Sequence, residues 1–256
     1  MKINDNVTKI MIPYKDIYTT VLIIKTDEGI VLFDTATYEE DVYNYILPSL
    51  KKEGIEKEDV KYIFISHNHG DHSGGLKWLA PLLPDAVILS NSPSLTEKYT
   101  AYKVKPLKDG EIVAGCLQHV LIPGHTPDAG GLLDLRTKTL MTGDALQVYG
   151  IYGSGKWGSN IKWPDLHLAV LPSLHELDVE QLIMAHEYHP CGSIVNGKEN
   201  IDRCIDDCAE ALYKIKAAIL ADPNADDAAL AANYNATQGL PTVGEKVFKA
   251  IRATIC

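Results

Sequence analysis

Three histidines and an aspartate fall within six residues of one another in the segment Ser66-His67-Asn68-His69-Gly70-Asp71-His72-Ser73-Gly74-Gly75. The apolar run over residues 60–65 comes directly before this segment and predicts a buried strand. His67 and His69 alternate, so they point to one side of an extended chain, and Gly70 then lets the backbone turn. Imidazole and carboxylate groups suit zinc or a similar divalent ion. The segment therefore predicts a metal site with more donors than one closed structural ion requires.

The spacing His67-x-His69-x-Asp71-His72 resembles the signature of the metallo-β-lactamase superfamily. The resemblance implies two adjacent metal sites that are completed by residues from later strand ends. The implied first-site ligands are His67, His69 and His125, the second-site ligands are Asp71, His72 and His186, and Asp144 is the bridging carboxylate. The sequence Ala185-His186-Glu187-Tyr188 is similar to the glyoxalase II branch, the hydroxyacylglutathione hydrolases.

Without the family resemblance, the sequence gives weaker evidence that the three later residues are metal ligands. His125, Asp144 and His186 each follow a short aliphatic run, where a strand would deliver a side chain to the edge of a sheet. A lone histidine in such a place is more often structural, and His189 competes with His186 as the last ligand. The remaining histidines lack motif context and are predicted to be core or surface residues: His119, His167 and His175.

Length, charge and cysteine content limit the class of protein. A chain of 256 residues with 46% hydrophobic residues is ordinary for a folded globular protein. Its net charge of −10 argues against nucleic-acid binding, because an acidic surface repels phosphate. Neither a signal peptide nor a membrane span is recognisable, and five irregularly spaced cysteines do not indicate a disulfide framework. We therefore expect a cytoplasmic enzyme whose partner is a small-molecule substrate, and no membrane or nucleic acid.

The order of predicted elements indicates an α/β protein. Two strand-rich halves with helices on their outer faces suggest stacked sheets between helical layers, which is the four-layer αβ/βα sandwich that the resemblance implies. We expect a catalytic domain over residues 1–196 and a small helical extension over residues 197–256. The expected strands are 19–25, 30–35, 118–122, 131–135, 139–142 and 181–185, and the expected helices are 38–53, 165–177, 201–220 and 226–234.

Two adjacent divalent ions would supply the chemistry. They can hold a bridging hydroxide at neutral pH by lowering the pKa of water from 15.7 to about 7, and they polarise the oxygen of the bond under attack. By analogy with the family, Asp144 would fix the spacing of the ions, and Asp71 would orient the nucleophile and pass on its proton. These two carboxylates are the predicted catalytic residues. We expect Zn²⁺, with Fe or Mn as alternatives, and cleavage of a small ester, thioester or lactone.

Departures from relatives narrow the reaction and leave alternatives open. Several metallo-β-lactamases use a cysteine as a second-site ligand, which the predicted ligand set lacks, so we do not expect antibiotic hydrolysis. Flavodiiron proteins have a glutamate where His69 stands, which disfavours an oxygen-reducing di-iron centre. Quorum-quenching lactonases have a tyrosine shortly after the bridging aspartate, whereas the third residue after Asp144 is Gln147. A mononuclear-iron persulfide dioxygenase and a phosphodiesterase stay as alternatives to the hydrolase. A non-catalytic metal-stabilised protein is disfavoured, because an open site with two ions exceeds what stability requires.

Three further features are open to two readings each. Asp34 ends a predicted strand and serves either as a strand cap or, as in the superfamily, as a residue near the metal pocket. Cys204 and Cys208 share an apolar helix face and are either core residues, which we predict, or reactive or metal-binding residues. The glycine-rich loop after Asp144 carries aromatic residues that form either a lid opposite the carboxyl-terminal helices or ordinary loop packing: Tyr149, Tyr152, Trp157 and Trp163.

Overall fold

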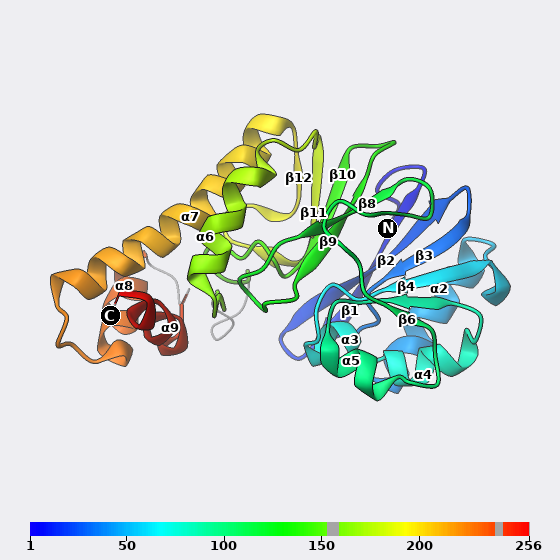
Figure 1. The fold of residues 1–256 in the computed structure, drawn as a ribbon, viewed down its shortest axis with the longest axis horizontal. Coiled ribbons are helices and arrows are strands. Elements are labelled where there is room, and N and C mark those ends of the chain that lie inside the picture. The colour runs from blue at the N-terminus through cyan, green and yellow to red at the C-terminus, as the bar shows by residue number, and fades with distance from the viewer. Residues whose placement is uncertain (153–158, 239–242, 256) are drawn as a thin grey trace. The chain divides into compact units, whose positions relative to one another are not determined.

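The computed structural model describes residues 1–152, 159–238 and 243–255, and its strands form two sheets of six. The first sheet has the order β1-β2-β3-β4-β5-β6 and the second has the order β12-β11-β10-β9-β8-β7. The chain divides into two compact units, one of Met1–Leu121 with Gly130–Arg136 and the other of Ile122–Ala129 with Thr137–Cys256. Figure 1 shows the elements of each unit.

The first unit begins with antiparallel strands and continues with parallel ones. β2 and β3 form the hairpin that the sequence predicts, with Thr26 opposite Gly29, while β3, β4, β5 and β6 pair in parallel. Parallel pairing requires crossover connections, and helical segments supply them here. The strands are β1 (Val7–Tyr14), β2 (Ile17–Thr26), β3 (Gly29–Phe33), β4 (Val60–Phe64), β5 (Val87–Leu89), β6 (Val104–Lys105), β7 (Ile112–Val113), β8 (Leu117–Leu121) and β9 (Gly130–Asp134).

Helical segments cover one face of the first sheet (Figure 1). Their apolar side chains, among them Val42, Ile46 and Leu79, join strand residues such as Ile12 and Ile63 in one buried core. The segments are α1 (Glu39–Asp41), η1 (Val42–Ile46), α2 (Leu47–Lys52), η2 (Lys57–Asp59), α3 (Gly70–Ser73), α4 (Leu76–Leu79), η3 (Ala80–Leu82) and α5 (Pro93–Lys98). This core fixes the end of β4, from which the histidine segment leaves.

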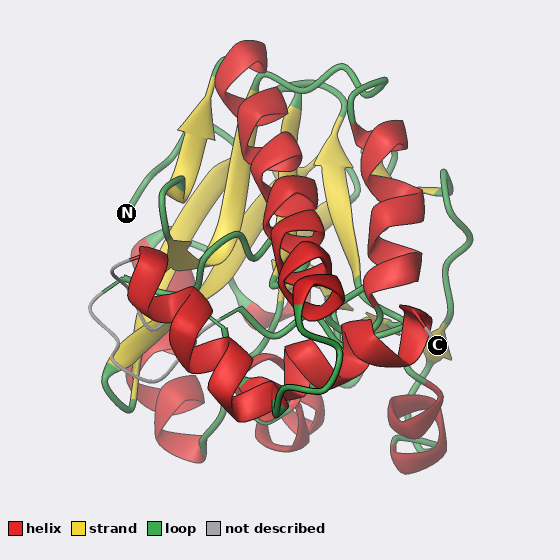
Figure 2. Cartoon of the chain, turned by 90° about the vertical axis from the view of Figure 1, so that its left-hand side faces the viewer, coloured by secondary structure: helices red, strands yellow, loops and turns green. Residues whose placement is uncertain are grey.

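The second unit combines three strands with the longest helix of the chain. β10 and β11 pair in parallel, β11 and β12 pair antiparallel, and α7 packs on β11 and β12. Figure 2 shows the helices of this unit in front of its strands. A separate core, which includes Leu212 and Phe248, joins α7 to the carboxyl-terminal helices. The elements are β10 (Thr139–Gly143), α6 (Pro164–Leu174), β11 (Gln181–Tyr188), β12 (Gly192–Asn196), α7 (Lys198–Ala221), α8 (Asp227–Gln238) and α9 (Glu245–Ile255).

The structure differs from the sequence prediction at two instructive places. The predicted helix over 38–53 is split into α1, the π-helical turn η1 and α2, with Pro48 in the first turn of α2. Val42, Ile46 and Leu50 of its apolar face are buried, whereas Tyr45 is exposed. The predicted strand over 181–185 continues to Tyr188, so His186 lies within β11 rather than beyond its end. The predicted division at residues 196 and 197 stays a prediction, although α7 begins at Lys198 as a helical extension requires.

Two findings bear on the class of protein. Among the helices in the described part of the chain, none combines the length and the apolar character that a membrane span requires. Cys204 and Cys208 are buried on α7 as predicted, and they carry free thiols, as Cys116 and Cys191 do.

Candidate metal centre

The histidine segment leaves the carboxyl end of β4 and ends in the short helix α3. His67 and His72 are buried, whereas His69 and Asp71 are partly exposed. The ring centroid of His67 lies 4.7 Å from that of His69 and 4.2 Å from that of His72. Nε2 of His72 lies 3.7 Å from a carboxylate oxygen of Asp71. The four predicted donors of the first unit therefore form one cluster.

The loop after β3 holds α3 in place. The backbone N–H and the hydroxyl of Thr35 both donate to the carbonyl oxygen of His72, at 2.7 Å and 2.9 Å. The approach is so close that a Cβ on Gly75 would lie 2.0 Å from the carbonyl oxygen of Thr35. Gly74 and Gly75 are thus required by the close contact of two backbones.

Asp34 is the first residue after β3, and its carboxylate contacts the histidine segment directly. One oxygen accepts from the backbone N–H of Ser66 at 2.8 Å; the other accepts from the Ser66 hydroxyl at 2.8 Å and lies 2.7 Å from Nδ1 of His72. Asp34 is fully buried, and burial raises the pKa of its carboxyl group, which the His72 and Ser66 contacts oppose. Of the two readings of Asp34, the structure supports the one near the predicted ligands.

The second unit brings its three predicted donors together as well. His125 follows β8, Asp144 follows β10, and His186 lies near the carboxyl end of β11; all three are buried. Oδ2 of Asp144 lies 3.6 Å from Nε2 of His125, and Oδ1 lies 3.3 Å from Nε2 of His186. The two oxygens of one carboxylate thus face two different histidines.

Three of the predicted histidine ligands have hydrogen-bond partners at Nδ1. Nδ1 of each of three rings has an oxygen nearby: Ser66 Oγ at 3.1 Å from His67, Asp34 Oδ2 at 2.7 Å from His72, and the Asn160 carbonyl at 2.8 Å from His125. An imidazole that donates through Nδ1 presents the lone pair of Nε2 to a metal ion. The donor set of five imidazoles and two carboxylates therefore fits divalent ions such as zinc or iron.

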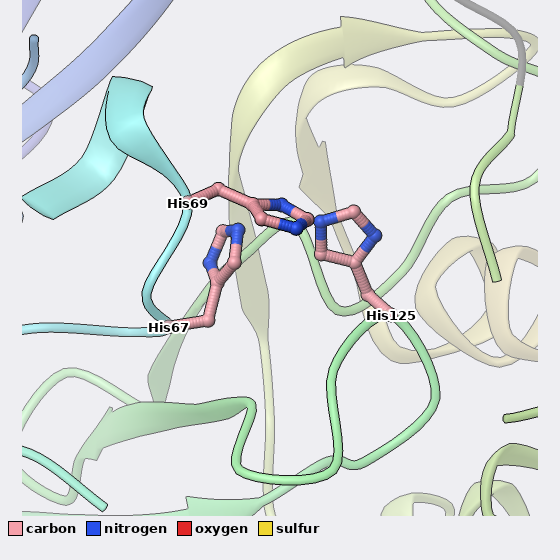
Figure 3. Close-up of side chains that lie close together, drawn as sticks. All are labelled: His67, His69 and His125. Carbon is pink, nitrogen blue, oxygen red and sulfur yellow. The ribbon is translucent and has the colours of Figure 1, made fainter. Parts of the chain in front are cut away.

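Three groups of these donors could hold a metal ion. Within each group one ligand atom per residue lies within 4.8 Å of the others. Figure 3 shows the side chains of the first group. The groups are His67, His69 and His125; His67, His72 and Asp144; and Asp71, His72 and His186. His189 belongs to none of these groups, and its ring lies against that of Tyr152 at an interplanar angle of 39°.

Sequence reasoning missed several residues around these donors. Ser66, Gln147 and the backbone carbonyl of Asn160 contact side chains of predicted ligands, and no motif in the sequence indicated these contacts. His167 proves to be a buried residue behind the His125 loop, where Nδ1 lies 3.0 Å from the carbonyl oxygen of Pro123. Burial lowers the pKa of His167 to about 4.

The aromatic residues after Asp144 differ in their exposure to solvent. Tyr149 is partly buried, and its hydroxyl lies 3.5 Å from Nζ of Lys214 on α7. Tyr152 and Trp163 are exposed, and Trp157 lies outside the described residues. Their role as a lid stays a prediction.

Comparison of the sequence with protein families gives a match over residues 14–190 to the model of the metallo-beta-lactamase superfamily. The chain is 28% identical over 159 residues to the uncharacterized protein YobT of Bacillus subtilis, covering 53% of this chain and 66% of YobT. It is 31% identical over 126 residues to a hydroxyacylglutathione hydrolase of Francisella philomiragia, covering 45% and 48%. It is 28% identical over 137 residues to the atrochrysone carboxyl ACP thioesterase of Emericella nidulans, covering 52% and 41%. The matched part is thus less than two thirds of each relative's length.

Solved structures share the fold at low sequence identity. The metallo-beta-lactamase family protein TTHA1429 of Thermus thermophilus superposes with a TM-score of 0.70 at 18% identity, covering 98% of this chain and 92% of that one. The rubredoxin oxygen:oxidoreductase of Desulfovibrio gigas superposes with a TM-score of 0.65 at 17% identity, covering 98% and 75%. The predicted α/β sandwich with a carboxyl-terminal helical region is therefore confirmed. Since the family model covers well over half of its residues, the chain belongs to the metallo-beta-lactamase superfamily.

Proposed function

We propose that this protein is a metal-dependent hydrolase that holds two divalent ions and cleaves a small ester or thioester. The observation that carries the proposal is the placement of Asp144, whose two carboxylate oxygens face His125 and His186 at 3.6 Å and 3.3 Å. A single carboxylate between two histidines is the arrangement by which one anion is shared by two cations. The three groups of donors around it support the same assignment.

Each predicted ligand has a defined part in this proposal. His67, His69 and His125 hold one ion, Asp71, His72 and His186 hold the other, and Asp144 lies between them. Two such ions, when bound, lower the pKa of a shared water and polarise a carbonyl oxygen. Asp71 is only partly buried and Asp144 is buried, so of the two carboxylates Asp71 is the one with access to the nucleophile and to the leaving group. We assign to it the orientation of the attacking water and the transfer of its proton.

The choice of a carbonyl substrate draws on the relatives. Two of them are named as a thioesterase and a hydroxyacylglutathione hydrolase, and the segment His186-Glu187-Tyr188 resembles the second class. Zinc is the ion we propose first, because it suits this donor set and needs no redox change in hydrolysis. We propose that the loop over residues 149–163 and the carboxyl-terminal helices select the substrate.

The test combines metal analysis with a substrate panel. Untagged protein is analysed for bound metals, reloaded to saturation and assayed with acyl-glutathione thioesters, simple lactones and phosphodiesters, while oxygen uptake is followed with a persulfide substrate. We expect carbonyl hydrolysis that is lost in Asp71→Asn and retained in Asp85→Asn, a control at an exposed carboxylate of the same unit. Phosphodiester turnover alone, or oxygen uptake alone, would contradict the proposal and support the corresponding alternative.

A further inference from the structure

Gln147 lies three residues after Asp144, and its buried carboxamide is the centre of a small hydrogen-bond network. Its Nε2 donates to the backbone carbonyl of Asp144 at 2.9 Å, and its Oε1 accepts from the backbone N–H of Asn160 at 2.8 Å. The same Nε2 lies 2.9 Å from Nδ1 of His125. One side chain therefore contacts both the His125 ring and the backbone of Asp144.

The two backbone partners fix the orientation of this amide. The carbonyl of Asp144 only accepts and the N–H of Asn160 only donates, so the amide places its nitrogen toward Asp144 and its oxygen toward Asn160. In the reverse orientation the amide oxygen would face the carbonyl oxygen of Asp144, and the amide nitrogen would face the N–H of Asn160. Both pairs would be unsatisfied in a buried site, which is costly. The Ser159 hydroxyl holds the backbone of Gln147 as well, by donating to its carbonyl oxygen at 3.0 Å.

As a consequence, Nδ1 of His125 has a suitable partner in either neutral tautomer. When Nδ1 carries the proton, it donates to the carbonyl oxygen of Asn160 at 2.8 Å; when Nε2 carries it, Nδ1 accepts from the amide of Gln147 at 2.9 Å. The contact with Gln147 therefore holds the ring before an ion binds at Nε2, and the contact with the Asn160 carbonyl holds it once Nδ1 carries the proton.

We propose that Gln147 is a positioning residue that holds His125 and Asp144 at the distance two ligands of one ion require, before that ion binds. This inference rests on the metal centre of the proposed function and not on the reaction assigned to it. Removal of a hydrogen-bond partner that orients a metal ligand typically lowers metal affinity by about 10- to 100-fold. Gln147 touches neither substrate nor ion, so its effect is expected first in ion binding.

The test compares Gln147→Met, which keeps the length of the side chain and removes its hydrogen bonds, with Gln181→Met as a matched control. Gln181 also uses its amide in two side-chain hydrogen bonds, to Thr139 and Asn196, but it lies at the opposite end of β11 from His186. Metal affinity is measured by competition with a chelator, the ligand geometry by the absorption spectrum of the Co²⁺-loaded protein, and folding by thermal unfolding without metal.

We expect Gln147→Met to weaken the tighter-bound ion by about 10-fold or more and to alter the Co²⁺ spectrum, whereas Gln181→Met changes neither. Gln147→Leu also removes both hydrogen bonds at a similar side-chain volume, and it serves as the second variant with the same loss expected. Unchanged affinity and spectrum in Gln147→Met, or in Gln147→Leu if the first variant does not fold, would overturn the proposal. If the wild type binds ions but cleaves no carbonyl substrate, the reaction is refuted and this comparison still decides the role of Gln147.

Discussion

Nδ1 of His72 lies 2.7 Å from Oδ2 of Asp34, and both side chains are fully buried. The contact joins the end of β3 to the helix that carries the predicted second-site ligands. A carboxylate behind a ligand histidine fixes the tautomer and makes the opposite nitrogen a stronger donor to a metal ion. In the proposed centre, Asp34 would therefore act on the ion through His72, as a positioning residue.

Replacement of Asp34 by asparagine should weaken the binding of one of the two ions by about 10- to 100-fold, because the neutral amide no longer supports His72 as an anion does. The measurement is a chelator titration of the metal-loaded variant. Asp134→Asn is the control, since Asp134 is equally buried and pairs with Arg136 at 2.8 Å rather than with a predicted ligand. Equal ion affinities in Asp34→Asn and the wild type would contradict this role.

Asp144→Ala should lose at least one bound ion and nearly all hydrolytic activity. The carboxylate is the shared anion of the proposed centre, and without it two cations would repel each other across a few ångströms of buried space. Metal content per chain and turnover are measured on the same preparation. A variant that kept two ions and full activity would refute the bridging role of Asp144.

Gly124→Ala should destabilise the fold strongly. Gly124 has a φ of +146°, and a Cβ at this position would lie 2.5 Å from Nδ1 of His167. Backbone strain and the clash together should cost about 3 kcal/mol or more in the free energy of unfolding. The matched control is Gly54→Ala, where φ is +69° and no atom lies within 4 Å, so only about 1 kcal/mol is expected from the backbone. Denaturant titration compares the two, and similar losses would show that the contact with His167 is unimportant.

His167 should make stability depend on pH. Its pKa falls from 6.5 to about 4 in the folded state, so the unfolded chain binds the additional proton and stability is lost as the pH falls from about 6.5 toward 4. The full effect is about 3 kcal/mol at 1.36 kcal/mol per pKa unit. His167→Gln, which does not titrate, should show a shallower pH dependence in metal-free protein. If the curves of wild type and variant run parallel between pH 4 and 6.5, burial of the neutral ring does not contribute as inferred.

The sequence predicted the donors of the first unit best, because His67, His69, Asp71 and His72 lie in one segment and share one local geometry. The hairpin of β2 and β3 was equally local, since residues 26–29 specify the turn. The extent of β11 was underestimated, because its pairing with β10 and β12 is not encoded in the aliphatic run alone.

The partners of the supporting residues could not be predicted from the sequence for a physical reason, although the resemblance placed Asp34 near the pocket. Asp34 and His72 are 38 residues apart, and Gln147 contacts His125 and Asn160 across 22 and 13 residues. Such pairs are set by the stacking of strands and loops, so a single polar residue gives no sign of its partner. His167 illustrates the same point, because its burial follows from the packing of α6 against Gly124 and not from its own surroundings in sequence.

The central claim is that seven side chains from separate strands and loops hold two ions around Asp144. Anomalous scattering at the zinc absorption edge, from crystals of zinc-loaded protein, tests it most directly. The account predicts two strong peaks, one within bonding distance of His67, His69 and His125, the other of Asp71, His72 and His186, and both next to the carboxylate of Asp144. A single peak, or peaks bound elsewhere in the chain, would contradict it.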